Sequence, residues 1–153
     1  MNFKRLIALM LSVVCVFALL LSAVSCGKSD FDATGWHEEN EKTKRGAGYD
    51  LFNGHKHYSI NVKDAIDIAV TVTTDSGEVY AEIYPKEMPT APVFSVKITR
   101  SAEGTVTAVK NGDAENPIIL EGNFTDSVRL ATEGDYIIHV SGTNHKGSFS
   151  FDW

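Results

Sequence analysis

A two-residue alternation of apolar and polar side chains dominates the sequence from residue 49 to its end. Residues 58–62, 66–72 and 79–84 show it most clearly, with an apolar residue at every second position. Successive side chains of a β-strand point to opposite faces, so this period indicates strands with one buried face. After residue 26 we find no helical apolar period that lasts three turns. The pattern therefore predicts an all-β domain.

Turn-forming residues separate the alternating runs at short intervals. Asn53-Gly54 is typical of a tight β-hairpin, and residues 75–77 and 142–147 predict further turns. The prolines within residues 85–92 predict a loop that crosses between sets of strands. We therefore expect about nine short strands that form a single antiparallel β-sandwich, Ig-like or jelly-roll-like, over residues 46–153.

The last predicted strand ends on aromatic residues. Phe149, Phe151 and Trp153 alternate with Ser150 and Asp152 up to the final position. An apolar face that continues to the last residue predicts that the C-terminus belongs to the core.

The N-terminus follows the order of a secretory signal peptide. Lys4 and Arg5 are basic, residues 6–21 are apolar apart from Ser12, and small residues then lead to Cys26. The apolar stretch is short for a membrane span, which needs ~20 residues. A basic start, an apolar middle and a small-residue end predict export.

Residues 22–26, Ser-Ala-Val-Ser-Cys, resemble a lipobox. The resemblance implies that the chain is cut just before Cys26 and that the Cys26 thiol is diacylated. Ala23 departs from the pattern, which usually has Leu at that position. An ordinary signal peptide with an incidental Cys is the alternative interpretation.

The expected organisation follows from that resemblance. Residues 1–25 would be a cleaved signal peptide, and residues 26–45 a lipidated Cys26 with a polar tether, in which Trp36 could mark the start of the fold. The protein would be anchored by lipid to the cell membrane, on its extracytoplasmic face. A bacterial surface lipoprotein of this kind suits either envelope type.

Cysteine content and charge narrow the expected partners. Cleavage before Cys26 leaves it as the single Cys, so no intramolecular disulfide can form. It also removes Lys4 and Arg5, which leaves 12 of the 14 basic residues against 20 acidic ones, a formal net charge of −8. An acidic domain disfavours nucleic acid as a partner. The expected partners are therefore the membrane, through the lipid anchor, and an envelope glycan, peptide or protein.

Residues 130–140, Leu-Ala-Thr-Glu-Gly-Asp-Tyr-Ile-Ile-His-Val, resemble the Leu…Gly-x-Tyr…Val run of fibronectin-type sandwiches. The resemblance implies that the Tyr136 hydroxyl closes a corner between strands. The buried Trp that those domains carry on an early strand is absent. Residues 134–149 also resemble the end of bacterial pre-peptidase C-terminal domains, which implies an accessory module of an exported protein.

Tyr80, Glu82 and Tyr84 form the first candidate site. Val79 and its aliphatic neighbours suit the core, which places the two tyrosines and the carboxylate together on the opposite face. Such a stripe can stack against a sugar ring or hold a cationic peptide group. Pairing of the tyrosines across strands is the alternative interpretation.

His55 and His57 form the second candidate site. Residues two apart on a strand share a face, so both imidazoles could reach one metal ion. A zinc site needs three or four ligands, and His37 or a carboxylate could complete it. A solvated hairpin shoulder after Asn53-Gly54 is the alternative interpretation.

The sequence contains no Gly-x-Ser-x-Gly elbow, and its one expected mature Cys is the lipid site. We therefore predict no enzyme and no cofactor. The leading hypothesis is a non-catalytic binding or accessory module for an envelope glycan, peptide or protein. A metal-binding or metal-sensing surface lipoprotein and a structural envelope lipoprotein are the alternatives.

Overall fold

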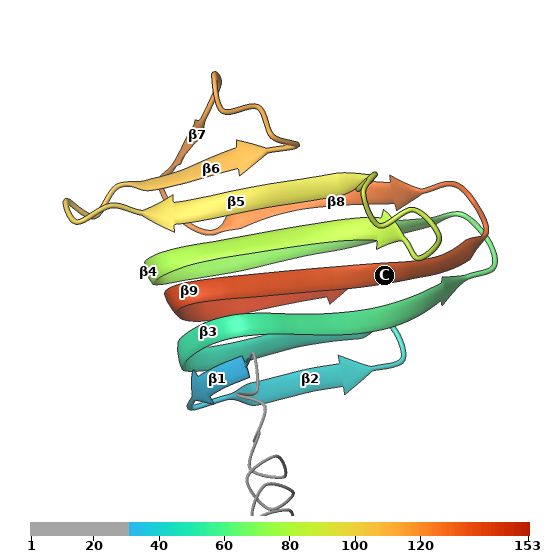
Figure 1. Ribbon diagram of the computed structural model, residues 1–153, viewed down its shortest axis with the longest axis horizontal. Coiled ribbons are helices and arrows are strands. Elements are labelled where there is room, and N and C mark those ends of the chain that lie inside the picture. The colour runs from blue at the N-terminus through green and yellow to red at the C-terminus, as the bar shows by residue number, and fades with distance from the viewer. Residues whose placement is uncertain (1–30) are drawn as a thin grey trace, which may run out of the picture.

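The computed structural model describes residues 31–153. These residues contain no helix and form one antiparallel sheet of nine strands that is not closed into a barrel (Figure 1). The predicted all-β class is confirmed. Among the described residues there is accordingly no helix long and apolar enough to cross a membrane. The strands are β1 (Phe31–Thr34), β2 (His37–Glu41), β3 (Lys44–Val62), β4 (Ile66–Pro85), β5 (Phe94–Arg100), β6 (Val106–Lys110), β7 (Ile118–Leu120), β8 (Phe124–Leu130) and β9 (Gly134–Asp152).

Three long strands, β3, β4 and β9, connect two layers of the sheet. Each bends near its middle, and Figure 1 shows the three ribbons turning back on themselves. β9 pairs with β3 on one side and with β4 on the other, both before and after the bend. Layer A contains the C-terminal halves of β3 and β4, the N-terminal half of β9, and β5 to β7. Layer B contains the other three halves with β2 and β8.

The predicted hairpin and turns at three places are wrong. Asn53-Gly54 and residues 75–77 and 142–147 lie inside continuous strands, at the bends of β3, β4 and β9. Register shifts in the pairing mark the bends. A residue that tolerates positive φ can make a bulge that bends a strand as readily as a turn that reverses it. The chain therefore changes layer at these positions and keeps its pairing partners.

Two glycines let the bends approach one another closely. Gly147 has a φ of 148°, and a Cβ there would lie 2.0 Å from the Thr73 carbonyl oxygen. Gly77 has a φ of 74°, and a Cβ there would lie 2.2 Å from the Asn144 carbonyl oxygen. Any side chain at either position would push β9 away from β4.

The core lies between the two layers. Tyr58 of layer A meets Phe149 of layer B edge to face, with ring centroids 6.2 Å apart. Phe151 is fully buried, which confirms the prediction that the last strand is core. Trp153 is half-buried and packs against that core. Polar residues of the alternating runs lie mainly on the outward faces, as predicted, whereas Thr74, Ser95 and His145 are buried.

The expected tether over residues 26–45 does not extend as far as predicted, because residues 31–45 belong to the sheet. β1 and β2 both pair with β3. Glu38 and Glu39, which made this segment appear solvated, form ion pairs across strands with Lys56 at 2.9 Å and Lys44 at 2.7 Å. The predicted signal peptide and Cys26, with residues 27–30, lie outside the described residues.

Trp36 packs at the start of the fold, where the sequence suggested it. Its ring stacks on Tyr49 with centroids 5.1 Å apart and an interplanar angle of 9°. It also contacts Phe52 and Phe149, at centroid distances of 5.4 and 6.1 Å. The segment before β2 therefore covers an aromatic part of the core.

A buried chain of polar groups links the bends of β3, β9 and β4. The Tyr49 hydroxyl lies 2.9 Å from Nδ1 of His145, and Nε2 of His145 lies 3.1 Å from Oγ1 of Thr74. Burial lowers the pKa of His145 to about 4, against a smaller opposing effect of Asp75. The ring is therefore neutral near neutral pH, and one donor and one acceptor nitrogen serve the two hydroxyls.

Tyr136 makes the corner contact that the resemblance to fibronectin-type sandwiches implied. Its side chain is buried, and its hydroxyl donates a hydrogen bond to the Thr132 carbonyl oxygen at 3.0 Å. The residue therefore fixes the entry of the chain into β9.

Replacing Gly147 by Ala is expected to lower the free energy of unfolding by more than ~2 kcal/mol, because the added Cβ meets the Thr73 carbonyl. Gly122→Ala is the matched control, since a Cβ at Gly122 has nothing within 4 Å. Urea unfolding of both variants measures the difference. Equal stability of the two variants would contradict the close approach of β9 and β4.

His145 is expected to make the fold sensitive to acid. Its pKa is about 4 in the fold and about 6.5 in the unfolded chain, so the unfolded state binds the proton more readily. The contribution of this ring is complete above about pH 6.5 and is lost as the pH falls toward about 4. Between about pH 7.5 and about pH 5 it should amount to about 2 kcal/mol.

Denaturant unfolding at both pH values measures that loss. His145→Gln should remove this part of the pH dependence, whereas His37→Gln, at an exposed position on β2, should keep it. A His145→Gln variant with the pH dependence of the unmodified protein would show that the buried ring is not responsible.

Candidate binding site

The outward face of β4 in layer A carries Tyr80, Glu82 and Tyr84. Val79, Ala81 and Ile83 are buried on the opposite face. The predicted facing of this strand is therefore confirmed. The two tyrosines are half-buried rather than fully exposed.

The outward face of β3 carries His55 and His57, and β9 lies between this strand and β4. The pairing register places His57 opposite His139, and His139 opposite Glu82. In the next row His55 lies opposite Ser141. The two candidate sites, predicted separately, thus lie on one surface with His139 between them.

A chain of hydrogen bonds crosses the three strands. The Tyr80 hydroxyl donates to Oε2 of Glu82 at 3.0 Å, and Oε1 of Glu82 lies 2.8 Å from Nδ1 of His139. Nε2 of His139 then lies 3.1 Å from Nδ1 of His55. We call the following six residues the outer-face cluster: His55, His57, Tyr80, Glu82, Tyr84 and His139.

The imidazole rings of the cluster are stacked. His57 and His139 lie nearly parallel, with centroids 4.4 Å apart and an interplanar angle of 6°. His55 and His139 have centroids 5.3 Å apart and an angle of 23°. The His139 ring therefore lies against both of the other imidazoles.

Burial within the cluster is graded. The side chains of His139 and Glu82 are only 15% and 16% exposed, whereas His55 and His57 are exposed. The inner pair is therefore held in place by its neighbours, while the two outer imidazoles remain accessible to a ligand.

Burial and neighbouring groups shift the pKa of three members of the cluster, His57, Tyr80 and Tyr84. Burial, followed by His139 and His55, lowers the pKa of His57, and Glu82 opposes this. Burial, followed by Glu82, raises the pKa of Tyr80 and of Tyr84. Both tyrosines therefore keep their hydroxyl protons near neutral pH.

The carboxylate decides which nitrogen of His139 carries a proton. An ionised Glu82 can only accept hydrogen bonds, so Nδ1 of His139 must donate to it. In the neutral ring this leaves Nε2 as an acceptor, and the N–H of Nδ1 of His55 donates a hydrogen bond to it at 3.1 Å.

Sequence reasoning identified five members of the outer-face cluster and missed His139. Alternation of Ile138 and Val140 places residue 139 on the outward face, which was the one available signal. Which strands lie beside β9 is a non-local property that the sequence pattern does not reveal. His37, the third metal ligand that we considered, is on β2 in layer B, where it lies opposite Gly48 of β3. It does not join the cluster.

Metal coordination by three protein ligands is not preformed. Across residues 31–153, no three His, Cys, Asp or Glu side chains are grouped so that they could hold one ion. The two facing imidazole nitrogens of His55 and His139 are the donors that the cluster offers.

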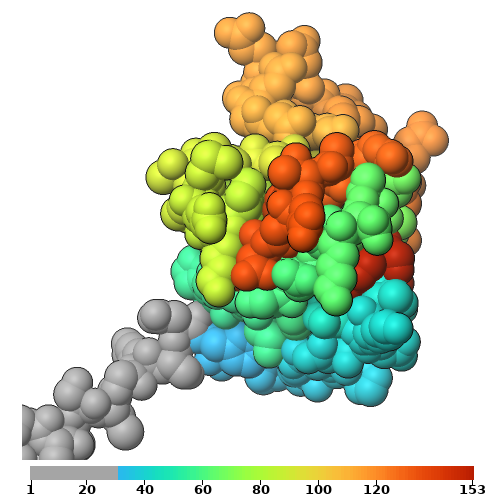
Figure 2. All heavy atoms as spheres, turned by 90° about the vertical axis from the view of Figure 1, so that its right-hand side faces the viewer, coloured from blue at the N-terminus to red at the C-terminus, as the bar shows by residue number. Residues whose placement is uncertain are grey.

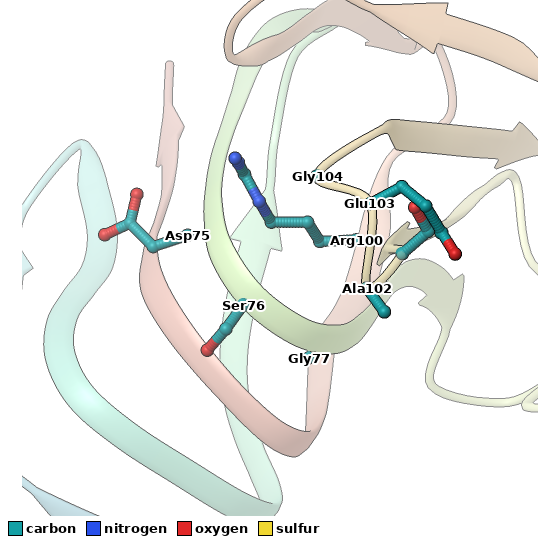
Figure 3. A pocket seen from close by; sticks show the side chains of 8 residues that line it. Asp75, Ser76, Gly77, Arg100, Ala102, Glu103 and Gly104 are labelled. Carbon is teal, nitrogen blue, oxygen red and sulfur yellow. The ribbon is translucent and has the colours of Figure 1, made fainter.

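Two cavities lie away from the cluster. One, of about 530 Å³, is lined by residues 75–77 and 100–104 (Figure 3), and Arg100 there donates a hydrogen bond to the Thr74 carbonyl oxygen at 3.3 Å. The other, of about 820 Å³, lies between the loop after β4 and the β8–β9 connection, which are side by side in Figure 2. Neither cavity is lined by a predicted site residue.

No protein-family model matches the sequence, and no curated protein matches it.

Proposed function

We propose that this chain is a lipid-anchored lipoprotein on the extracytoplasmic face of the cell membrane, and that its β-sandwich is a non-catalytic binding module. The N-terminal sequence supports the anchor: a basic start, an apolar run, and small residues leading to Cys26. The binding role rests on the outer-face cluster.

One observation carries the binding role: two residue sets predicted separately converge on one surface. Tyr80, Glu82, His139 and His55 form a continuous hydrogen-bonded chain across three strands. In layer A, β9 and β4 are each paired on both sides, and the part of β3 that carries His55 is paired with β9 on one side. Side chains on such rigid elements are held in a fixed arrangement, as a binding site requires.

The exposed groups define what the surface can recognise. Glu82 accepts hydrogen bonds from Tyr80 and His139, and its side chain is only 16% exposed, so little of the carboxylate faces a ligand in solution. The accessible groups are the imidazoles of His55 and His57, with Tyr84 at half exposure. Flat rings with polar edges suit an envelope glycan, a peptide or a partner protein.

The positions of the hydroxyl–imidazole hydrogen bonds, which a catalytic nucleophile and its base would need, support binding rather than catalysis. Within residues 31–153, the hydrogen bonds that join a hydroxyl to an imidazole are those of His145 with Tyr49 and Thr74. His145 is fully buried and Thr74 is 7% exposed. A nucleophile needs access to its substrate, so we assign this group to the stability of the fold.

The anchor proposal predicts that Cys26→Ser abolishes lipid labelling and releases the protein from the membrane fraction. Metabolic labelling with a fatty-acid analogue, followed by detergent phase partition, measures both. Cys15→Ser is the control and should be labelled as the unmodified chain is. Labelling that survives Cys26→Ser would contradict the anchor.

The binding proposal predicts that a ligand of the envelope stabilises the protein through the outer-face cluster. A thermal-shift panel would contain cell-wall fragments, oligosaccharides, short peptides and divalent metal ions. A ligand at a hundredfold excess over its Kd stabilises the folded state by roughly 2.7 kcal/mol. The combined variant His55→Ala, His57→Ala, Tyr84→Ser should lose the shift.

His37→Ala, an exposed histidine in layer B, is the control and should keep the shift. A ligand that stabilises the triple variant as well as the unmodified protein would place binding elsewhere. No shift with any member of the panel would favour a structural role in the envelope over binding.

A further inference from the structure

We propose that the outer-face cluster binds a divalent transition-metal ion, Zn²⁺ or Cu²⁺, through Nδ1 of His55 and Nε2 of His139. The inference rests on the proposed function, in that it names a ligand class for the same surface.

The distance between the two nitrogens supports shared coordination. Nδ1 of His55 and Nε2 of His139 lie 3.1 Å apart. Zinc–imidazole bonds of about 2.0–2.1 Å at tetrahedral angles place two ligand nitrogens ~3.3 Å apart. The strands therefore hold the two donors close to the separation that one ion requires. The two nitrogens face each other in a hydrogen bond, so the rings must rotate for both lone pairs to meet at one ion. Without an ion, the N–H of Nδ1 of His55 occupies the contact, with Nε2 of His139 as its acceptor. When an ion binds, His55 exchanges this proton through solvent and takes the tautomer with its proton on Nε2. The ring stays neutral, and the lone pairs of Nδ1 of His55 and Nε2 of His139 are both available to the ion.

Glu82 prepares His139 for this role. Metal-binding imidazoles usually donate their second N–H to a carboxylate or carbonyl, which fixes the tautomer and raises the basicity of the ligand nitrogen. Oε1 of Glu82 accepts from Nδ1 of His139 at 2.8 Å, and the Tyr80 hydroxyl holds the other carboxylate oxygen at 3.0 Å. Glu82 is therefore a positioning residue, and it directs the lone pair of Nε2 of His139 toward His55.

His57 and the exposure of the site complete the arrangement. The His57 ring lies parallel to His139 at 4.4 Å and limits rotation of that ring. Since no three donors are grouped among residues 31–153, the ion would have two protein ligands, with water in the remaining positions. His55 is exposed, so those positions open to solvent. Imidazole donors with open positions suit Zn²⁺ and Cu²⁺, and Cu²⁺ should bind more tightly.

The experiment is calorimetric titration of the full chain in detergent with ZnCl₂ and with CuSO₄, after alkylation of free thiols. The unmodified protein should bind one equivalent of either ion. His55→Ala and His139→Ala should each weaken binding by at least about tenfold, and Glu82→Gln by about tenfold. His37→Ala, outside the cluster, should bind as the unmodified protein does. Because His55 is exposed, its variant keeps the test valid if His139→Ala is poorly folded.

Electron paramagnetic resonance of the Cu²⁺ complex separates ligands from the positioning residue. Nitrogen hyperfine structure should indicate two imidazoles in the unmodified protein and one in His55→Ala. Glu82→Gln should bind more weakly and keep the two-nitrogen pattern, which a merely structural effect on folding would not produce.

The outcomes distinguish this inference from the proposed function. No metal binding, or binding that is unchanged in His55→Ala and His139→Ala, would overturn the metal site. If a glycan or peptide then bound and was lost in the triple cluster variant, the binding module would stand without the metal. Metal binding that follows the predicted order of variants would support both.

Discussion

The hydrogen bonds from His145 to Tyr49 and Thr74 are the interaction on which the two-layer fold depends. They join β9 to β3 and β4 at the positions where all three strands bend. Thr74 and His145 are buried at these bends, and buried polar groups without partners cost free energy. The neutral imidazole satisfies a hydroxyl on each side. The fold therefore keeps its layers in register through a polar contact, surrounded by aromatic packing of Trp36, Tyr49 and Phe149.

The strand class and the facing of side chains were predictable from the sequence, because both depend on neighbouring residues. Val79, Ala81 and Ile83 face inward as the alternation indicated. The bends were not predictable. Asn53-Gly54 has the local chemistry of a hairpin, but β3 and β9 pair on both sides of it, and this long-range pairing makes the position a bend. Residues 31–41 were also missed, since their charges are paired with the neighbouring strand β3: Glu39 with Lys44 and Glu38 with Lys56.

In the candidate site, too, the facing of the side chains was predictable from the sequence and the pairing of the strands was not. Alternation placed His55, His57, Tyr80, Glu82 and Tyr84 on outward faces, and the structure agrees. Their meeting depends on β9 lying between β3 and β4, which brings His139 into contact with Glu82 and His55. The tyrosine stripe and the histidine pair thus become one surface, and Glu82 changes from a free carboxylate into the partner of His139. Metal binding and recognition of a larger envelope ligand are compatible, since a bound ion with open positions can itself contact a ligand.

The most direct test of this account is an anomalous difference map, measured at the zinc absorption edge from crystals of the protein soaked in zinc. The account predicts a single strong peak between Nδ1 of His55 and Nε2 of His139, within bonding distance of both nitrogens and with the Glu82–His139 contact retained. A map with no peak at the outer-face cluster, or with zinc only at other surface histidines such as His37, would contradict it.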